Sequence, residues 1–246
     1  MSQPLSIFIG YDAREHEAYR VAQFSLERRT LKPVIITPLV LSHLSSLLTR
    51  QVTRTGDGKL WCPISQAPMS TEFAISRFCV PFIQRAGWAL FMDCDILCLA
   101  DISELFELAD ERYAVMVVKH DHVPAETLKM GGQVQTAYPR KNWSSVILWN
   151  CGHPANLRLT KERLNFWPGR DLHAFKWLRD EEIGELPAEW NYLVGISQVS
   201  SPRILHFTLG GAWIEDWPAG PYDNLWLKEK RVLDVVCGNF SVAEFV

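Results

Sequence analysis

The sequence lacks any large imbalance or local run of charge. Its 246 residues carry a formal net charge of −3, and no basic tract occurs in it. Proteins that bind nucleic acid generally concentrate lysine and arginine to neutralise phosphates. The composition therefore gives no electrostatic reason to expect a nucleic-acid partner. An anionic ligand would need positive charge supplied within its own site.

Long apolar segments and paired cysteines are also missing. No run approaches the roughly 18 apolar residues of a membrane-spanning helix, so no membrane span is expected. The start "MSQPLSIFIG" has neither the charged beginning nor the long apolar region of a signal peptide. The six cysteines form no Cys-x-x-Cys pair and no zinc-ribbon spacing. Several lie within apolar runs, which predicts buried free thiols and a reducing, cytoplasmic location.

Strand and helix patterns alternate from the beginning of the chain. The apolar run 5–10 ends at a glycine and predicts a buried strand. Asp12 and Glu15 then form a capping-box pattern, which predicts a helix that continues to residue 29. The run 33–40 predicts a second strand. This strand–helix–strand opening is typical of an α/β nucleotide-binding layer.

The remaining patterns favour an α/β fold in a single compact domain over 1–246. Strands are expected at 88–99, 113–120, 144–151 and 204–211. Helices are expected at 70–87, 102–108, 160–167, 173–181 and 224–237, the first of them kinked at Pro81. The polar stretches 49–69 and 121–142 are predicted to be loops and candidate lids.

The stretch "WALFMDCDIL" places two carboxylates, Asp93 and Asp95, in an apolar strand. Residues i and i+2 of a strand point to the same face, so both side chains should converge while Cys94 faces the core. Repulsion and burial both penalise such a pair. Mg²⁺ or Mn²⁺ prefers carboxylate oxygens and would relieve both effects at the C-terminal end of a strand. The alternative is that one carboxylate caps a turn and the other pairs with an Arg or a Lys.

Phosphatases of the haloacid-dehalogenase type also end an apolar strand in Asp-x-Asp. Their pattern has a Thr two residues further on and lies near the first strand of the fold. In this chain Ile96 and Leu97 follow Asp95, and the motif lies in mid-chain. The phosphatase interpretation is therefore disfavoured.

Several segments in chain order resemble the motifs of one enzyme family. They are "IFIGYD", "SRFCVPFI", "ALFMDCDIL", "WSSVILWN", "DLHAF", "LPAEWN" and "LHFTLGGAW". Together they resemble a nucleotide-sugar glycosyltransferase of the GT-A fold, similar to glycosyltransferase family 8. The resemblance implies a Rossmann-like nucleotide-binding sheet flanked by helices, a nucleoside diphosphate sugar as donor (preferentially UDP-linked), and Mn²⁺ or Mg²⁺ as cofactor. It also implies a saccharide or lipid-linked acceptor and retention of the anomeric configuration.

The resemblance also assigns roles to individual residues. His206 matches the late histidine that is the family's third metal ligand, and neutral imidazole suits Mn²⁺. Tyr11 and Asp12 match the turn that contacts uracil, although Tyr11 fits an ordinary turn aromatic equally well and Asp12 fits a helix cap. Arg77 is a cation within an apolar helix. It is expected to pair with Asp93 or the donor phosphate, or else to extend to the surface.

On the sugar side of the site, Asp171 is the candidate for a supporting catalytic role near the reaction centre. Capping of the following helix is the alternative. Asn142, Ser144 and Ser145 are expected to bind sugar hydroxyls or to belong to a strand edge.

The chain departs from the family's pattern in three places. One is the family's acceptor-side Asn, which is either replaced by Trp143 or shifted to Asn142. Where the family has a Lys that touches the diphosphate, this chain has Gly210, Gly211 and Ala212. The glycine pair either lets backbone N–H groups approach a diphosphate or only makes a turn. Where the family has an Asp-Gln-Asp segment, this chain has Leu172 in place of the Gln and His173 in place of the second Asp.

The missing Lys leaves open which cation meets the diphosphate. Arg140 and Lys141 are the first candidates, followed by Lys228 and Lys230, and a solvated basic face is the alternative reading of these residues. The segments "TLGGAW" and "YPRKNWSSVILWN" resemble signatures of a distinct bacterial branch of such enzymes, whose acceptor the sequence does not indicate.

The sequence therefore predicts a metal-dependent glycosyltransferase. Its nucleotide-binding half is expected over 1–100 and ends in the Asp-x-Asp strand, and its sugar and acceptor half is expected over 101–246. One alternative is a nucleotide-sugar hydrolase or sugar nucleotidyltransferase with the same metal site. Another is a non-catalytic nucleotide-sugar-binding protein of the same fold. The sequence indicates no oligomeric state.

Overall fold

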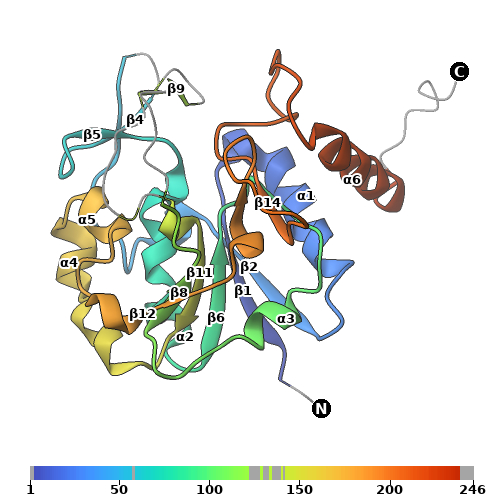
Figure 1. Ribbon diagram of the computed structural model, residues 1–246. Coiled ribbons are helices and arrows are strands. Elements are labelled where there is room, and N and C mark those ends of the chain that lie inside the picture. The colour runs from blue at the N-terminus through green and yellow to red at the C-terminus, as the bar shows by residue number, and fades with distance from the viewer. Residues whose placement is uncertain are drawn as a thin grey trace, which may run out of the picture.

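The computed structural model describes residues 3–56, 59–121, 128–129, 133–134, 140 and 142–238. At its centre lies a six-stranded mixed sheet with the order β12–β8–β11–β6–β1–β2 (Figure 1). β1 is parallel to β2 and β6, β11 is antiparallel to β6 and β8, and β12 is parallel to β8. The bounds are β1 Leu5–Gly10, β2 Val34–Leu39, β6 Trp88–Met92, β8 Val115–Val117, β11 Val146–Asn150 and β12 Ile183–Glu185. The predicted α/β fold is confirmed.

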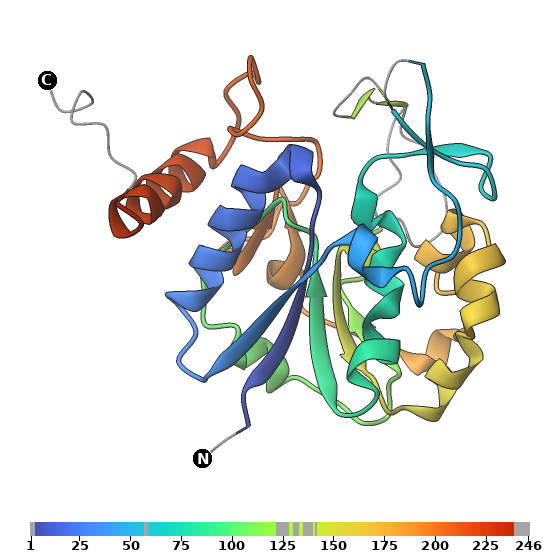
Figure 2. The same ribbon diagram turned by 180° about the vertical axis from the view of Figure 1, so that it is seen from behind.

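β6 lies between β1 and β11, and its last four residues are completely buried. A strand that is covered on both faces requires a continuous apolar run, which explains "WALFM". The parallel strands β1 and β6 run upward in Figure 2, away from the N-terminus. The chain that follows β6 therefore emerges at the C-terminal edge of these strands, where α/β sheets bind their ligands.

A second sheet of three strands begins just after this edge. Its order is β13–β14–β7, with β13 Tyr192–Leu193, β14 Ile204–His206 and β7 Ile96–Cys98. The single strand predicted for 88–99 is therefore wrong. The chain leaves the large sheet after Met92 and joins the small one at Ile96, so residues 93–95 form the bend between two sheets.

Helices lie on two sides of the central sheet. α1 (His16–Glu27) and α6 (Asp223–Val236) lie at one side, and α4 (Lys161–Phe166) and α5 (Gly169–His173) at the other (Figures 1 and 2). The apolar residues that predict α1 are all buried. Arg28 and Arg29 at its C-terminal end contact Glu229 of α6 at 3.3 and 2.7 Å, which joins the two helices. The shorter helices are α2 Val80–Gln84, α3 Ser103–Phe106, η1 Ala13–Glu15, η2 Leu41–Leu44, η3 Glu72–Ala74, η4 Ser76–Cys79, η6 Trp143–Ser145, η7 Pro154–Arg158, η8 Asp180–Glu182 and η9 Ala188–Asn191.

Several predicted elements differ from the structure. The helix expected over 70–87 is divided into η3, η4 and α2, and Pro81 lies in the first turn of α2, where its missing N–H costs little. The helix expected over 173–181 is wrong, because α5 ends at His173 and Phe175 has a φ of +50°. The loop expected over 49–69 contains a small sheet of β3 (Thr53–Arg54), β4 (Leu60–Cys62) and β5 (Ala67–Met69).

Most of the second predicted loop, 121–142, lies outside the described residues, as does Lys141. Its described part includes the short strands β9 (Leu128–Lys129) and β10 (Gln133–Val134). A lid in this segment therefore stays a prediction. Within the described ranges, none of the helices has both the length and the apolar character needed to cross a membrane.

Candidate functional site

The bend between β6 and β7 carries the two predicted metal ligands. Asp93 and Asp95 are half-buried there, and Cys94 between them is completely buried, as expected. The backbone N–H of Asp93 donates to the Ser145 carbonyl at 2.9 Å. The Asp95 carbonyl accepts from the N–H of Phe207 at 2.8 Å. Both flanks of the bend are thus fixed to neighbouring elements.

His206 reaches the same place from β14. Antiparallel pairing of β14 with β7 sets His206 opposite Ile96, next to the bend. Its Nε2 lies 3.4 Å from Oδ1 of Asp95. One ligand atom each of Asp93, Asp95 and His206 lie within 4.8 Å of one another. The structure therefore brings His206 together with two carboxylates that precede it by more than a hundred positions in sequence.

Asn191, at the end of η9, holds the imidazole of His206 in place. Its Oδ1 lies 3.0 Å from Nδ1 of His206, and its Nδ2 donates to Oγ of Ser145 at 2.9 Å. Because the amide N–H₂ group faces Ser145, the amide oxygen faces His206. It accepts a hydrogen bond from the Nδ1–H group of that imidazole. Nε2 then has its lone pair available toward the two carboxylates. A ligand histidine held through its other nitrogen is the usual arrangement in metal sites, so this donor set fits Mn²⁺ or Mg²⁺.

Arg77 is buried beside the carboxylates and does not extend to the surface. Its Nη1 lies 2.9 Å from Oδ1 of Asp93 and donates to the Ser144 carbonyl at 2.7 Å. Its guanidinium carbon lies 5.6 Å from the ring centre of Phe73 and 5.1 Å from that of Phe91. The Arg77–Asp93 pairing that the sequence suggested is therefore present in the structure.

Glu15 adds a further carboxylate that the sequence analysis assigned only to a helix cap. It is 3% exposed and accepts a hydrogen bond from Sγ of Cys94 at 3.1 Å. Burial, followed by repulsion from Asp95, raises the pKa of Glu15 from 4.5 to about 8, although the Cys94 hydrogen bond opposes the rise and Asp12 and Asp93 add to it. Glu15 therefore tends to keep its proton beside Asp93 and Asp95, whose own carboxylates supply the negative charge that favours the binding of a cation.

Asp12 caps η1, which is the helix-cap role that the sequence suggested for it as the alternative to contact with uracil. Its carboxylate accepts from the backbone N–H of Arg14 and that of Glu72, both at 3.0 Å, and forms an ion pair with the Arg14 guanidinium at 2.6 Å. Burial raises the pKa of Asp12, but these hydrogen bonds outweigh it and hold the pKa below its usual value. The predicted return contact from Glu15 is replaced by its bond with Cys94. Tyr11 precedes this turn, and its hydroxyl lies 3.2 Å from Nδ1 of His16.

Ser144 and Ser145 are each 4% exposed, and their hydroxyls are used inside the protein. Oγ of Ser144 lies 2.7 Å from Nδ1 of His173, and Oγ of Ser145 donates to the Asn142 carbonyl at 2.8 Å. Asn142 has a left-handed backbone with a φ of +63°. It is the backbone carbonyls of Ser145 and Ser144 that support the bend, through the Asp93 N–H and through Arg77. Contact of Asn142, Ser144 or Ser145 with a sugar stays a prediction.

Asp171, the predicted supporting residue for catalysis, lies in the first turn of α5. Its Oδ1 lies 2.7 Å from Nζ of Lys176 and 3.7 Å from Nε of Arg170. No contact among the described residues joins it to the carboxylate cluster. His173, two residues later, does reach Ser144. The catalytic role of Asp171 therefore stays a prediction.

The glycine pair after β14 is packed against tryptophan rings. A Cβ atom at Gly210, whose φ is +125°, would lie 2.7 Å from the ring of Trp217. A Cβ atom at Gly211 would lie 2.3 Å from the ring of Trp213. A side chain at either position would therefore displace an indole ring. This packing gives a reason for both glycines that does not depend on a ligand. Arg140, the first candidate to replace the missing Lys, pairs with Asp180 instead.

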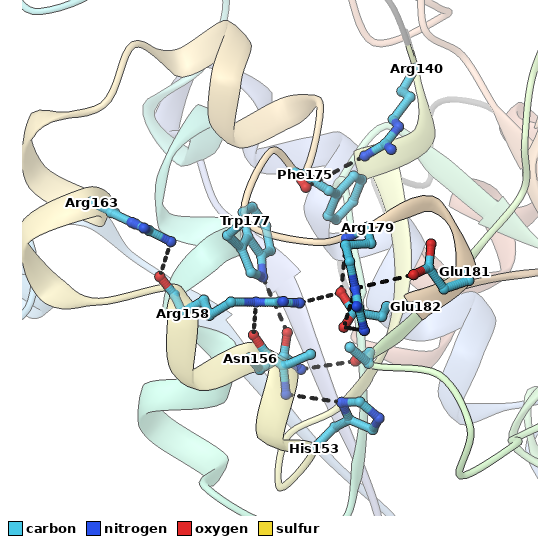
Figure 3. Close-up of polar contacts among 12 residues, drawn as sticks. Arg140, His153, Asn156, Arg158, Arg163, Phe175, Trp177, Arg179, Glu181 and Glu182 are labelled. Carbon is cyan, nitrogen blue, oxygen red and sulfur yellow. Dashed lines mark hydrogen bonds and ion pairs between the residues drawn. The ribbon is translucent and has the colours of Figure 1, made fainter.

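A second cluster of charge surrounds the buried Glu182 at the other end of the central sheet, and the two arginines that pair with it are partly exposed. Figure 3 shows its polar contacts. Glu182, just before β12, pairs with the guanidinium groups of Arg158 and Arg179. Burial raises the pKa of Glu182, but hydrogen bonds from Arg179 and Arg158 outweigh it and lower the pKa from 4.5 to about 2. Asn156 completes the cluster with bonds to the carbonyls of Ala114 and Asn150, both at 2.9 Å. Glu181 also pairs with Arg179 at 3.1 Å, so two carboxylates face two guanidinium groups and the cluster is balanced in charge. The cluster joins η7 and η8 to the segments beside β8, β11 and β12.

Sequence reasoning missed Glu15, Asn191 and His173 as members of the site. Asn191 ends the "LPAEWN" segment, so its place in a matched motif was the available signal. The spacing of Glu15 from Asp12 predicted a role in helix capping, so its contact with Cys94 was not expected. His173 was noted only as a departure from the family pattern, and its neighbour Ser144 comes from a distant segment.

No family model matches the chain. The chain is 46% identical to Protein CDI of Arabidopsis thaliana over 234 residues, which cover 92% of this chain and 86% of that protein. Its fold is similar to that of the glycosyltransferase GlyE from Streptococcus pneumoniae TIGR4, with a TM-score of 0.59 and 14% identity over 97% of this chain. It spans 64% of the GlyE chain, which is less than two thirds.

The galactosyltransferase LgtC, solved in complex with donor and acceptor sugar analogs, is also similar in fold. Its TM-score is 0.57 at 13% identity, over 93% of this chain and 96% of LgtC. The structure therefore has the GT-A glycosyltransferase fold that the sequence predicts. Membership of glycosyltransferase family 8 and of a bacterial branch stays a prediction.

Proposed function

The chain belongs to the family of Protein CDI from Arabidopsis thaliana, and we propose that it is a metal-dependent glycosyltransferase. It transfers a sugar from a nucleoside diphosphate sugar, preferentially a UDP-sugar, to a saccharide or lipid-linked acceptor. By its resemblance to glycosyltransferase family 8, the anomeric configuration is retained. The observation that carries the proposal is the cluster of Asp93, Asp95 and His206 at the ligand-binding edge of a glycosyltransferase fold.

In this proposal Asp93, Asp95 and His206 hold Mn²⁺ or Mg²⁺. A divalent cation bound there supplies Lewis-acid stabilisation of the charge on a diphosphate leaving group. Asn191 keeps the Nδ1 proton of His206 in place, so that Nε2 can act as a ligand. Arg77 forms an ion pair with Asp93 and supplies buried positive charge beside the cluster.

Thermal-shift measurements with UDP, GDP and CDP, each with and without Mn²⁺, test the proposal. We expect UDP with Mn²⁺ to raise the melting temperature more than either does alone, since a ligand that binds only the folded state stabilises it. Asp95→Ala should abolish the metal-dependent increment. Glu182→Gln is the matched control, because it alters a buried carboxylate at the opposite end of the sheet and should retain the increment. If no nucleotide stabilises the wild-type protein in a metal-dependent way, the proposal fails.

One observation favours a second candidate, a non-catalytic nucleotide-sugar-binding protein. The late motif has no Lys, and tryptophan rings occupy the space beside its glycines. Such a protein would show the same thermal shift but would release neither free sugar nor transferred product from UDP-sugars. Free sugar without transfer would instead indicate a nucleotide-sugar hydrolase.

A further inference from the structure

Cys94 connects the two acidic ligands to a buried carboxylate from another part of the chain. It is completely buried between Asp93 and Asp95, and its Sγ donates to Oε2 of Glu15 at 3.1 Å. The thiol lies between two backbone attachments of the bend, at the Asp93 N–H and at the Asp95 carbonyl. Arg77 also holds the side chain of Asp93.

Glu15 is itself held by a rigid turn. It is the last residue of η1, whose first turn is closed by the Asp12 carboxylate and by the bond from Glu15 N–H to the Asp12 carbonyl at 2.9 Å. The Arg14 guanidinium donates to the Ser70 carbonyl at 2.8 Å, which fixes the turn to the segment before η3. The acceptor of the Cys94 thiol therefore has little freedom to move.

Side chains that hydrogen-bond around a metal site orient its ligands, and their loss typically weakens metal affinity about 10- to 100-fold. A bend that carries two ligands at i and i+2 depends on the orientation of the residue between them. If the backbone dihedral angles of Cys94 changed, the directions of the flanking residues would change, and the two carboxylates would move apart from their present positions. No other sequence position lies between the two ligands.

We propose that Glu15 is a positioning residue of the metal site and acts through Cys94, holding the Asp93–Asp95 bend in the geometry that binds the cation. The inference rests on the proposed function, because it concerns the same metal site. Its role is distinct from that of a ligand: the thiol needs an acceptor at this position, and a neutral amide oxygen can also provide one.

The test is the affinity of the full chain for Mn²⁺ in the presence of UDP, measured from the free Mn²⁺ signal in electron paramagnetic resonance. Glu15→Leu removes the acceptor, and we expect about 10-fold weaker binding. Glu15→Gln retains an acceptor and should bind Mn²⁺ within about threefold of the wild type. Cys94→Ala should weaken binding as much as Glu15→Leu does, whereas Cys94→Ser, which keeps a donor, should restore most of the affinity.

The double variant Glu15→Leu/Cys94→Ala should bind no more weakly than the weaker single variant, because both remove the same link. Cys98→Ala is the matched control: Cys98 is an equally buried thiol that donates to the Ala100 carbonyl, and its loss should leave the affinity unchanged. Cys94→Ala tests the link without disturbing the buried carboxylate, should Glu15→Leu fail to fold.

Wild-type affinity in Glu15→Leu or Cys94→Ala would overturn the inference. So would equal losses in Glu15→Gln and Glu15→Leu, because the negative charge would then be what matters. Additive losses in the double variant would show two independent effects and would also overturn it. Absence of Mn²⁺ binding by the wild-type protein would contradict the proposed function itself, and the inference with it.

Discussion

Two buried glutamates at opposite ends of the central sheet have opposite electrostatic surroundings. Glu15 is buried against the thiol of Cys94, and burial, followed by repulsion from Asp95, Asp12 and Asp93, raises its pKa to about 8. Glu182 faces two arginines, and its pKa is lowered to about 2. The hydrogen bond with Cys94 places Glu15 beside the C-terminal end of β6, and Glu182 directly precedes β12, which starts at the opposite end of the sheet (Figure 3 shows the Glu182 contacts).

The difference separates a structural charge cluster from a candidate binding site. A cluster whose charges balance within the protein stabilises the fold and needs no further ligand. A cluster with excess negative charge destabilises the fold unless a cation binds, and such costs are typical of functional sites. Substitutions in the two clusters should therefore affect stability and metal binding differently.

Glu182→Gln should reduce the free energy of unfolding by about 2 kcal/mol, because hydrogen bonds to charged groups contribute roughly 1.5–3 kcal/mol. The substitution removes the negative charge with which Arg158 and Arg179 both pair. Urea denaturation monitored by tryptophan fluorescence measures it. An unchanged unfolding midpoint would show that this cluster contributes no stability and would break the contrast.

Asn191→Ala should weaken Mn²⁺ binding about 10-fold, because the tautomer and orientation of His206 are no longer fixed. Asn156→Ala is its matched control, since Asn156 is a buried amide of the structural cluster. The control should lose comparable stability in urea and keep its Mn²⁺ affinity. Equal Mn²⁺ affinities of the two variants would contradict the role given to Asn191.

Asp95→Asn should stabilise the metal-free protein by about 1 kcal/mol, since it removes a charge from a crowded acidic cluster. The same change should abolish the stabilisation by Mn²⁺. Thermal unfolding in a chelator and then in Mn²⁺ measures both effects. Destabilisation of the metal-free protein would mean that Asp95 has a structural partner that outweighs the repulsion.

The pH dependence of stability should have opposite signs at the two glutamates. Because the pKa of Glu15 is raised in the folded state, its contribution is fully present below pH 4.5 and is lost as the pH rises to about 8. In metal-free Glu15→Gln that loss should disappear. The contribution of Glu182 is present above pH 4.5 and is lost as the pH falls through about 2. Urea midpoints across this pH range compare the wild type with Glu15→Gln, and parallel curves would show that Glu15 does not titrate as described.

The parts of the fold that follow from local pattern could be predicted. β1, α1, β6 and α6 have strong apolar periodicity or long buried runs, and the structure contains each of them. The split of 88–99 between two sheets could not be read from the sequence, because both halves are equally apolar. The same limit applies to α5, since the left-handed backbone at Phe175 leaves no compositional signal.

The candidate site divides in a similar way. Asp93, Asp95 and His206 were found because their motifs resemble a known family and because buried carboxylates demand compensation. Glu15 and Asn191 depend on contacts between distant segments, Glu15 with Cys94 and Asn191 with both Ser145 and His206. Only the folded chain brings these segments together. The capping-box pattern predicted that Glu15 would bond to the backbone at Asp12 and so gave no indication of its bond with Cys94.

Anomalous diffraction from crystals grown with Mn²⁺ and UDP tests directly whether Asp93, Asp95 and His206 bind a divalent cation. We expect one strong manganese peak in contact with Asp93, Asp95 and Nε2 of His206, and no peak at the Glu182 cluster. We also expect that the peak disappears in Asp95→Ala while the fold is unchanged. Manganese bound elsewhere, or an empty Asp93–Asp95–His206 cluster at saturating Mn²⁺ and UDP, would contradict this expectation.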